Sequence, residues 1–570
     1  MRRFVAAAAI VAVVFALGGA TAAAAKKPDP GLAVLAHMNH IVVIYEENHS
    51  FDNLYGGWEG VNGRPAAPVK QMNANGVAFS CLMQQDVNLT SPPQPGDCTD
   101  STTGTAFTTH FPNQPFGIDA LIPPTATTCP PPGVFAANGV TPSAGVAGGC
   151  TRDIVHRFYQ EQFQLDNGKM DRYVLGSDAT GLTMGYYDTK ALPIYKYLHA
   201  AGHPRYAIAD NMFQAAFGGS FLNHQWLVAA ATPLWANAPN DGGANDLHSV
   251  VDGNGMPTNY PLYTSGIGGA LRDLQLTVSC SAPAGRPGAP AKLACGDFAV
   301  NTSQPTYQPF APGTAPSRQL PPLTNPTIGD RLSAAHVDWA WYSGGWSNAD
   351  GDVGSPGWTN GNGPTCTDPY HLSTAVYPNC PDANFQFHHQ AFNYFASFAP
   401  GTQARKDHLK DEVEFENLAA ASKQSCKLKP VSFIKPIGEE NEHPGYASEA
   451  EGSNHLVGLL KSIEGSACAK DTMVIVTYDE FGGQWDHVPP PGTVGAVPGA
   501  HDKWGPGTRI PALVLSPMLR SDFVVDHVEH DTTSILTTIE KRWNLKPVAT
   551  RDGAVASLAT AFKAKAPTLK

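Results

Sequence analysis

The chain has 570 residues, of which 42% are hydrophobic, so it can bury a large core. Its formal net charge of −12 argues against nucleic acid as a partner, because proteins contact the phosphate backbone through an excess of lysine and arginine. The negative charge does not exclude a phosphate-bearing substrate, since a bound metal ion reverses the field locally.

Residues 1–25 have the features of a secretory signal peptide. Arg2 and Arg3 precede an apolar run that ends in four alanines at 22–25. A basic start, a short apolar stretch and small residues are typical of a cleaved export signal, whereas a membrane anchor is the alternative. We therefore expect an exported protein, periplasmic or secreted, with no membrane span in its mature form.

Buried strands and helices alternate along the chain. Such alternation predicts an α/β fold, a sandwich of helices around a largely parallel central sheet, in which ligands gather at the carboxyl ends of the strands. Runs of β-branched residues predict the strands, and apolar residues spaced on one face predict the helices. The strands are expected at 38–45, 472–478 and 510–515, and the helices at 150–165, 452–463 and 531–543.

Two segments differ in amino-acid composition from the rest of the chain. Residues 58–150 and 280–385 are rich in Pro, Gly, Thr and Asn and hold eight of the ten cysteines. We interpret them as loop insertions over one large domain at 26–570, because the candidate functional segments are scattered along the whole chain.

The ten cysteines fall in neighbouring couples along the chain. In an exported protein an even number of cysteines indicates disulfides, and the rival zinc site is disfavoured because no CxxC pair is present. The simplest pairing joins Cys81 with Cys98, Cys129 with Cys150, Cys280 with Cys295, Cys366 with Cys380, and Cys426 with Cys468.

Acidic and amide side chains follow two of the predicted strands. Glu47 and Asn48 follow the first, and Asp479 and Glu480 follow the strand at 472–478. Oxygen donors of this kind suit a divalent cation. The structural alternatives are a helix cap for the first segment and an acidic turn for the second.

Ser220 follows two glycines and precedes a helix-like stretch. A serine at a helix start could act as a nucleophile, because the helix N-terminus attracts an anion such as phosphate, although an ordinary N-cap is the alternative. Three histidines, His156, His389 and His443, could bind phosphate oxygens or donate protons. His156 is expected on a helix, and His443 is crowded in sequence by acids that would favour its protonated form.

Taken together, these segments resemble the phosphoesterase family of AcpA-type acid phosphatases and bacterial phospholipases C, which has the alkaline phosphatase-like fold. The matches lie between about residues 38 and 545. They include Glu46 to Asn53, Gly218 to His224, Glu442 to Pro444, Asp479 to Pro491, Gly507 to Pro511 and His530 to Ser534.

The resemblance implies a divalent metal ion, of a kind the sequence does not specify, held by Glu47, Asn48, Asp479 and Glu480. It implies Ser220 as the nucleophile, with His156, His389 and His443 lining the phosphate pocket. Phospholipase members usually carry threonine where this chain has Ser220.

The expected function is therefore that of an exported acid phosphatase, which hydrolyses phosphate monoesters through a phosphoserine. His443 or His389 is expected to protonate the leaving alkoxide. A phospholipase C acting on lipids is the first alternative, and an inactive exported binding protein is the second. The sequence does not indicate the oligomeric state.

Overall fold

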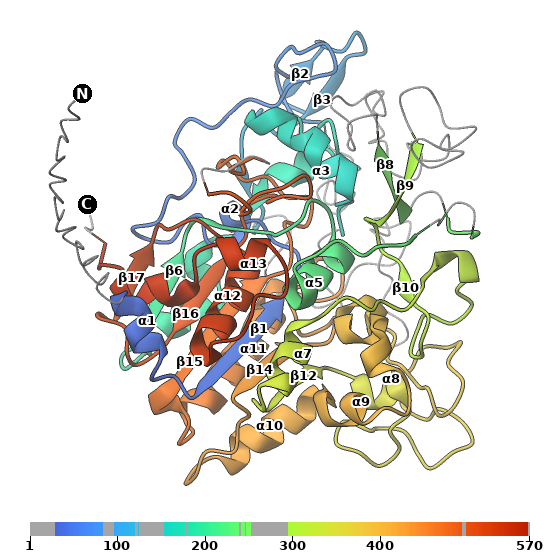
Figure 1. Cartoon of the computed structure of the whole chain (residues 1–570). Coiled ribbons are helices and arrows are strands. Elements are labelled where there is room, and N and C mark those ends of the chain that lie inside the picture. The colour runs from blue at the N-terminus through green and yellow to red at the C-terminus, as the bar shows by residue number, and fades with distance from the viewer. Residues whose placement is uncertain are drawn as a thin grey trace, which may run out of the picture.

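A computed structural model describes residues 29–83, 96–119, 124, 153–177, 179–236, 238, 241–244, 247–251, 294–492 and 497–567. An eight-stranded sheet forms the centre of the fold (Figure 1). Its strands, in spatial order, are β13 (Leu409–Asp411), β12 (Trp339–Ser343), β14 (Val431–Lys435), β1 (His40–Glu46), β15 (Thr472–Tyr478), β16 (Ala512–Leu515), β6 (Tyr206–Ala209) and β17 (Phe523–Asp526).

The central sheet is largely parallel, as the sequence predicts. β1 pairs in parallel with β14 on one side and β15 on the other, so that Val43 lies opposite both Phe433 and Ile475. β16 runs antiparallel to its two neighbours, β15 and β6. The three predicted strands correspond to β1, β15 and β16, whose apolar side chains are buried because both faces of the sheet are covered.

Helices pack in two groups around this sheet. α11 (Glu449–Glu464) contacts both α4 (Pro193–Leu198) and α10 (Glu412–Ala421). α5 (Ser220–Ala229) contacts both α7 (Ile328–Ala334) and α12 (Thr533–Trp543), and α12 also contacts α13 (Arg551–Ala554). Figure 1 shows α12 and α13 in front of the sheet. Other helices of the fold are α1 (Pro30–Leu35), α2 (Phe51–Leu54), α8 (Trp346–Asp350) and α9 (Gln403–His408).

The helix predicted at 150–165 is shorter than expected. The structure has α3 at Phe158–Leu165, preceded by Arg157 in an extended conformation. His156 therefore lies before the helix rather than on it. The segment is held in this form because the Nδ1 atom of His156 binds the Ile154 carbonyl oxygen at 2.5 Å.

The segment 280–385 is not wholly a surface insertion, contrary to the prediction. β12 lies within it and pairs with both β13 and β14 in the central sheet, and Trp339 and Trp341 are fully buried. The flanking Gly- and Asn-rich sequence conceals this short aromatic strand. Small two-stranded sheets make up much of the remaining strand structure: β2 (Cys98–Asp100) with β3 (Phe107–Thr109), β4 (Phe116–Gly117) with β5 (Gly185–Tyr186), β7 (Met212–Phe213) with β18 (His530–Asp531), β8 (His248–Val251) with β9 (Ala294–Ala299), and β10 (Gln304–Pro305) with β11 (Gln319–Leu320).

Three predicted disulfides are confirmed: Cys81 with Cys98, Cys366 with Cys380, and Cys426 with Cys468. The couples Cys129 with Cys150 and Cys280 with Cys295 fall outside the residues whose side chains are described, as does the predicted signal peptide at 1–25. Among the helices in the described ranges, none is long and apolar enough to cross a membrane.

The Cys426–Cys468 disulfide ties together the loops that enter β14 and β15, the two strands that flank β1. We predict that replacing both cysteines with serine lowers the free energy of unfolding by about 2–4 kcal/mol, because the bridge restricts a long loop of the unfolded chain. Urea denaturation of the two proteins measures the difference. The Cys366→Ser/Cys380→Ser protein, which opens a shorter loop, serves as the comparison, and an unchanged transition for the Cys426→Ser/Cys468→Ser protein would contradict the prediction.

Candidate active site

Three neighbouring strands deliver charged groups to one edge of the sheet. Lys435 ends β14, Glu47 follows β1, and Asp479 follows β15, and all three side chains are buried. Because β14, β1 and β15 are parallel and adjacent, their carboxyl ends lie together. The topology therefore brings residues that are almost 400 positions apart into contact.

Ser220 is the first residue of α5, and its hydroxyl faces this cluster. The Oγ atom lies 3.1 Å from Glu47 Oε2, 3.4 Å from Asn48 Oδ1 and 3.5 Å from Glu480 Oε1. Gly219 is the N-cap of α5 and has no side chain to occupy the first-turn N–H groups. The serine and the four residues predicted to bind metal thus meet at one place.

The turn after β15 depends on a glycine. Gly482 has a φ of 63°, and a Cβ atom at this position would lie 2.2 Å from the carbonyl oxygen of Asn48. The Gly482 N–H donates a hydrogen bond of 2.6 Å to Glu480 Oε2. Only glycine permits this close approach, which holds Glu480 beside Asn48.

The carboxylates of the cluster are buried, so water does not screen their mutual repulsion. Burial, and then the charge of Asp479, raises the pKa of both Glu47 and Glu480 well above the ordinary range. Burial also raises the pKa of Asp479. Such a concentration of buried negative charge requires a positive counterpart.

Lys435 provides part of that charge, and the sequence analysis did not identify it. Its Nζ atom lies 2.5 Å from Glu47 Oε1 and donates a hydrogen bond of 2.8 Å to the Tyr45 carbonyl oxygen. The side chain is completely buried. The position of Lys435 at the end of β14, which pairs with β1, could have indicated its place in the site. The sequence analysis did not use this signal because it did not predict β14.

A divalent metal ion would supply the positive charge that the carboxylates require beyond that of Lys435. Glu47, Asn48, Asp479 and Glu480 supply the carboxylate and amide oxygens that hard cations bind. Asp479 Oδ2 is buried and accepts no hydrogen bond in the described structure. These residues therefore suit a cation in both donor type and charge.

A pair of imidazole rings lies against Glu47. His389 Nε2 is 3.1 Å from Glu47 Oε1, and the ring of His224 stacks on that of His389 with centroids 4.8 Å apart. Burial, and then the charge of Lys435, lowers the pKa of both histidines well below the ordinary value. His389 is thus in the site as predicted, whereas His224, one turn after Ser220 on α5, was missed.

His443 lies at the site, but the prediction that nearby acids favour its protonation is wrong. Its Nδ1 donates to the Pro444 carbonyl oxygen at 2.8 Å, and its Nε2 accepts from Asn48 Nδ2 at 3.0 Å. Burial lowers its pKa well below the ordinary value. The neighbouring Glu442 points elsewhere and accepts a hydrogen bond from the Tyr478 hydroxyl.

His156 approaches from the segment before α3. Its Nε2 lies 3.2 Å from Glu480 Oε1 and its Nδ1 lies 3.6 Å from Asp153 Oδ1. Oxygen atoms therefore face both ring nitrogens, so either nitrogen has an acceptor to which it could donate a hydrogen bond. The ring also borders a cavity, which the buried rings of His224 and His389 do not line.

Glu161 supports the loop that carries the serine and is a further residue that the sequence analysis missed. Its Oε2 accepts hydrogen bonds from the Gly218 N–H at 2.5 Å and from Gln214 at 2.9 Å. Its Oε1 accepts from the Thr508 N–H at 2.7 Å. The carboxylate thereby fixes the backbone two residues before Ser220.

Comparison with known proteins identifies the family. The Phosphoesterase family matches residues 38–546. Phospholipase C B and phospholipase C A of Mycobacterium tuberculosis are 36% and 34% identical over 169 and 168 residues, which make up 26% of this chain and 32% of each relative. Non-specific phospholipase C6 of Arabidopsis thaliana is 28% identical over 152 residues, 24% of this chain and 29% of that protein.

The chain thus aligns with about a third of the length of these curated relatives. A 2-O GAG sulfatase of known structure matches 68% of this chain and 72% of its own at 11% identity, with a TM-score of 0.29 that is too low to establish a shared fold. The family match, in contrast, covers nearly the whole described structure and confirms the resemblance found in the sequence. The chain belongs to the Phosphoesterase family.

Proposed function

We propose that this chain is an exported enzyme that hydrolyses phosphate monoesters with Ser220 as its nucleophile. The observation that carries the proposal is the position of the Ser220 hydroxyl, within 3.5 Å of oxygens from Glu47, Asn48 and Glu480 at the start of α5. A divalent cation held by Glu47, Asn48, Asp479 and Glu480 would, when bound, lower the pKa of the hydroxyl and neutralise charge on the phosphoryl group.

The chain's own groups perform the transfer in two displacements. Ser220 Oγ attacks phosphorus, the bond from phosphorus to the ester oxygen breaks, and a phosphoserine forms at the first turn of α5. The N–H groups of that turn attract the phosphoryl oxygens. Water then attacks phosphorus, breaks the bond to Ser220 and releases phosphate.

His156 is the proton donor that the geometry favours for the leaving alkoxide. His443 already donates from Nδ1 and accepts at Nε2, and the pKa of His389 is lowered by burial, so neither ring is suited to carry an extra proton. This assignment replaces the prediction of His443 or His389 as the general acid. His389 and His443 instead orient Glu47 and Asn48.

The proposal has two alternatives, a phospholipase C and an inactive binding protein. The named relatives are phospholipases C, which favours a lipid phosphodiester as the rival substrate. Ser220 in place of the usual threonine supports the monoesterase. Against an inactive binding protein, every residue that the proposed chemistry uses is present and in contact.

We also propose that the domain is single, that its helices complete a three-layer alkaline phosphatase-like sandwich, and that residues 1–25 direct export.

Replacing Ser220 with alanine should reduce kcat by about a thousandfold or more, because the nucleophile is lost while the surrounding ligands stay. Turnover of para-nitrophenyl phosphate measures the effect, and the thermal unfolding midpoint verifies the fold. Ser462→Ala, on α11, is the matched control. A Ser220→Ala enzyme with a near-normal rate would remove this serine from the mechanism.

Replacing Asp479 with asparagine should lower both bound metal and kcat, since one charged ligand is removed from the cluster. Elemental analysis of the purified protein measures the metal, and Asp522→Asn, at an exposed carboxylate, is the control. Full metal content in Asp479→Asn would show that the cation binds elsewhere.

Monoesterase and phospholipase activity can be compared on one preparation. We expect kcat/KM for para-nitrophenyl phosphate to exceed that for phosphatidylcholine in mixed micelles. Dominant release of phosphocholine from the lipid would instead establish the phospholipase C alternative.

A further inference from the structure

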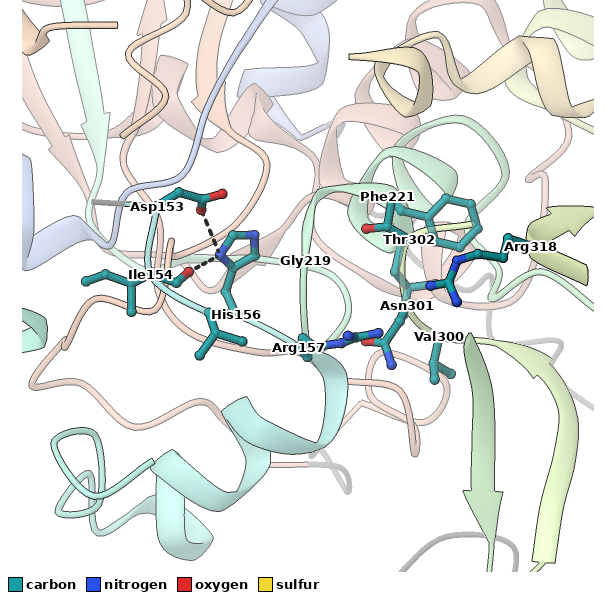
Figure 2. A pocket seen from close by; sticks show the side chains of 12 residues that line it. Asp153, Ile154, His156, Arg157, Gly219, Phe221, Val300, Asn301, Thr302 and Arg318 are labelled. Carbon is teal, nitrogen blue, oxygen red and sulfur yellow. Dashed lines mark hydrogen bonds and ion pairs between the residues drawn. The ribbon is translucent and has the colours of Figure 1, made fainter. Parts of the chain in front are cut away.

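A second group of acids and an imidazole lies outside the proposed active site. Glu412 is the first residue of α10, Glu440 lies in the segment between β14 and α11, and His455 lies on α11. We name these three residues the α10–α11 cluster. His455 Nε2 is 2.8 Å from Glu412 Oε1, and His455 Nδ1 is 3.8 Å from Glu440 Oε1. None of the three residues lines the cavity beside His156 (Figure 2), so the cluster is a separate feature of the fold.

The α10–α11 cluster has the spacing of ligands around one ion. One ligand atom from each of its three side chains lies within 4.8 Å of the other two. Atoms that bind one ion at about 2.0–2.4 Å are themselves separated by about 3–5 Å, depending on whether they are neighbours or lie opposite each other. A single ion can therefore contact all three side chains with little movement.

Glu412 has an oxygen atom that the surrounding protein leaves unpaired. Its Oε1 meets His455, but its Oε2 is buried and accepts no hydrogen bond in the described structure. The side chain is only 5% exposed, so water does not surround this oxygen. An acid in the first turn of a helix is ordinary, but a buried charged oxygen without a partner is strongly destabilising. The position of Oε2 therefore indicates a ligand with positive charge.

Glu46 adds another unpaired carboxylate near the α10–α11 cluster. It ends β1, is completely buried, and neither of its carboxylate oxygens accepts a hydrogen bond in the described structure. Burial, and then the charge of Glu442, raises its pKa well above the ordinary value. Two members of the cluster also act on it, since His455 lowers this pKa and Glu412 raises it. Consecutive side chains at a strand end point in opposite directions, which directs Glu46 away from the site that Glu47 serves.

Negative charge exceeds positive charge in this region. Burial lowers the pKa of His455, but the charge of Glu412 raises it, to about 10 overall, so the ring carries a proton. This one imidazolium faces the two carboxylates of the cluster and that of Glu46. Lys435, which also acts on Glu46, is already paired with Glu47 at 2.5 Å. A divalent cation that displaces the imidazolium proton into the solvent adds one net positive charge.

We propose that Glu412, Glu440 and His455 bind a second metal ion, a divalent transition-metal ion such as Mn²⁺ or Zn²⁺. Carboxylates combined with an imidazole form the donor set of such ions, whereas Ca²⁺ and Mg²⁺ are bound through oxygen. Glu440 is 44% exposed and offers the ion a path from the solvent. The bound ion would neutralise charge around Glu46 and fasten α10 to α11, next to the end of the strand that carries Glu47 into the proposed active site.

Counting bound ions tests the proposal. The purified protein, freed of metal with EDTA, is titrated with Mn²⁺ alone, and electron paramagnetic resonance follows the free ion. We expect Glu412→Gln/His455→Gln to bind one ion fewer than the wild type, because two ligands of the cluster are lost. Glu59→Gln/His199→Gln, which removes another histidine–glutamate pair, is the matched control and should keep the wild-type count. Equal counts for the cluster variant and the wild type would overturn the proposal.

A stability measurement tests the same site without the double variant. In Asp479→Asn, Mn²⁺ at about a hundredfold its dissociation constant should raise the thermal unfolding midpoint by about 2 °C, because an ion that binds only the folded chain stabilises it. The further change Glu440→Gln, at the more exposed acid of the cluster, should weaken Mn²⁺ binding about tenfold and reduce this rise. An Asp479→Asn protein whose midpoint does not respond to Mn²⁺ would overturn the proposal.

The ion count separates this inference from the proposed function. If Asp479→Asn binds as many Mn²⁺ ions as the wild type, the proposed cation beside Ser220 is wrong, while the loss of one ion in Glu412→Gln/His455→Gln still supports the second site. If Asp479→Asn removes the last ion that the wild type binds, the second site is wrong even in an active enzyme.

Discussion

Three carboxylates, from Glu47, Asp479 and Glu480, are held out of water around one serine hydroxyl, and this concentration of charge constrains the whole site. Burial raises the pKa values of all three, and the charge of Asp479 further raises those of Glu47 and Glu480, so the three stay ionised together only beside positive charge. Lys435 supplies one such charge through its contact with Glu47. The oxygen atoms left over are of the type that hard cations bind, and the Ser220 hydroxyl lies within 3.5 Å of oxygens from Glu47 and Glu480.

The same buried charge arrangement explains the unusual histidines. Burial, and then the charge of Lys435, lowers the pKa of both His224 and His389, so these rings lie beside Glu47 as neutral groups rather than as acids. His156 differs because it is partly exposed and borders the cavity.

Much of the fold follows from local sequence. The long β-branched runs give β1 and β15, since such residues fit a sheet that is covered on both faces. β12 was missed because two tryptophans within a Gly- and Asn-rich stretch do not form a recognisable period. The start of α3 was misplaced because a contact of the His156 ring with the Ile154 carbonyl oxygen, which the apolar spacing does not reveal, keeps the residues before the helix extended.

For the site, the sequence by itself determined which residues have suitable chemistry: the acids after two strands, the glycines of the turn and the serine at a helix start. Only the tertiary structure decided which of the many histidines and lysines belong with them. Lys435 reaches Glu47 because β14 pairs with β1, and the acids near His443 point away from it because Glu442 binds Tyr478. Proximity in sequence does not determine electrostatic environment, because strand pairing and burial set the distances and the dielectric on which a charge depends.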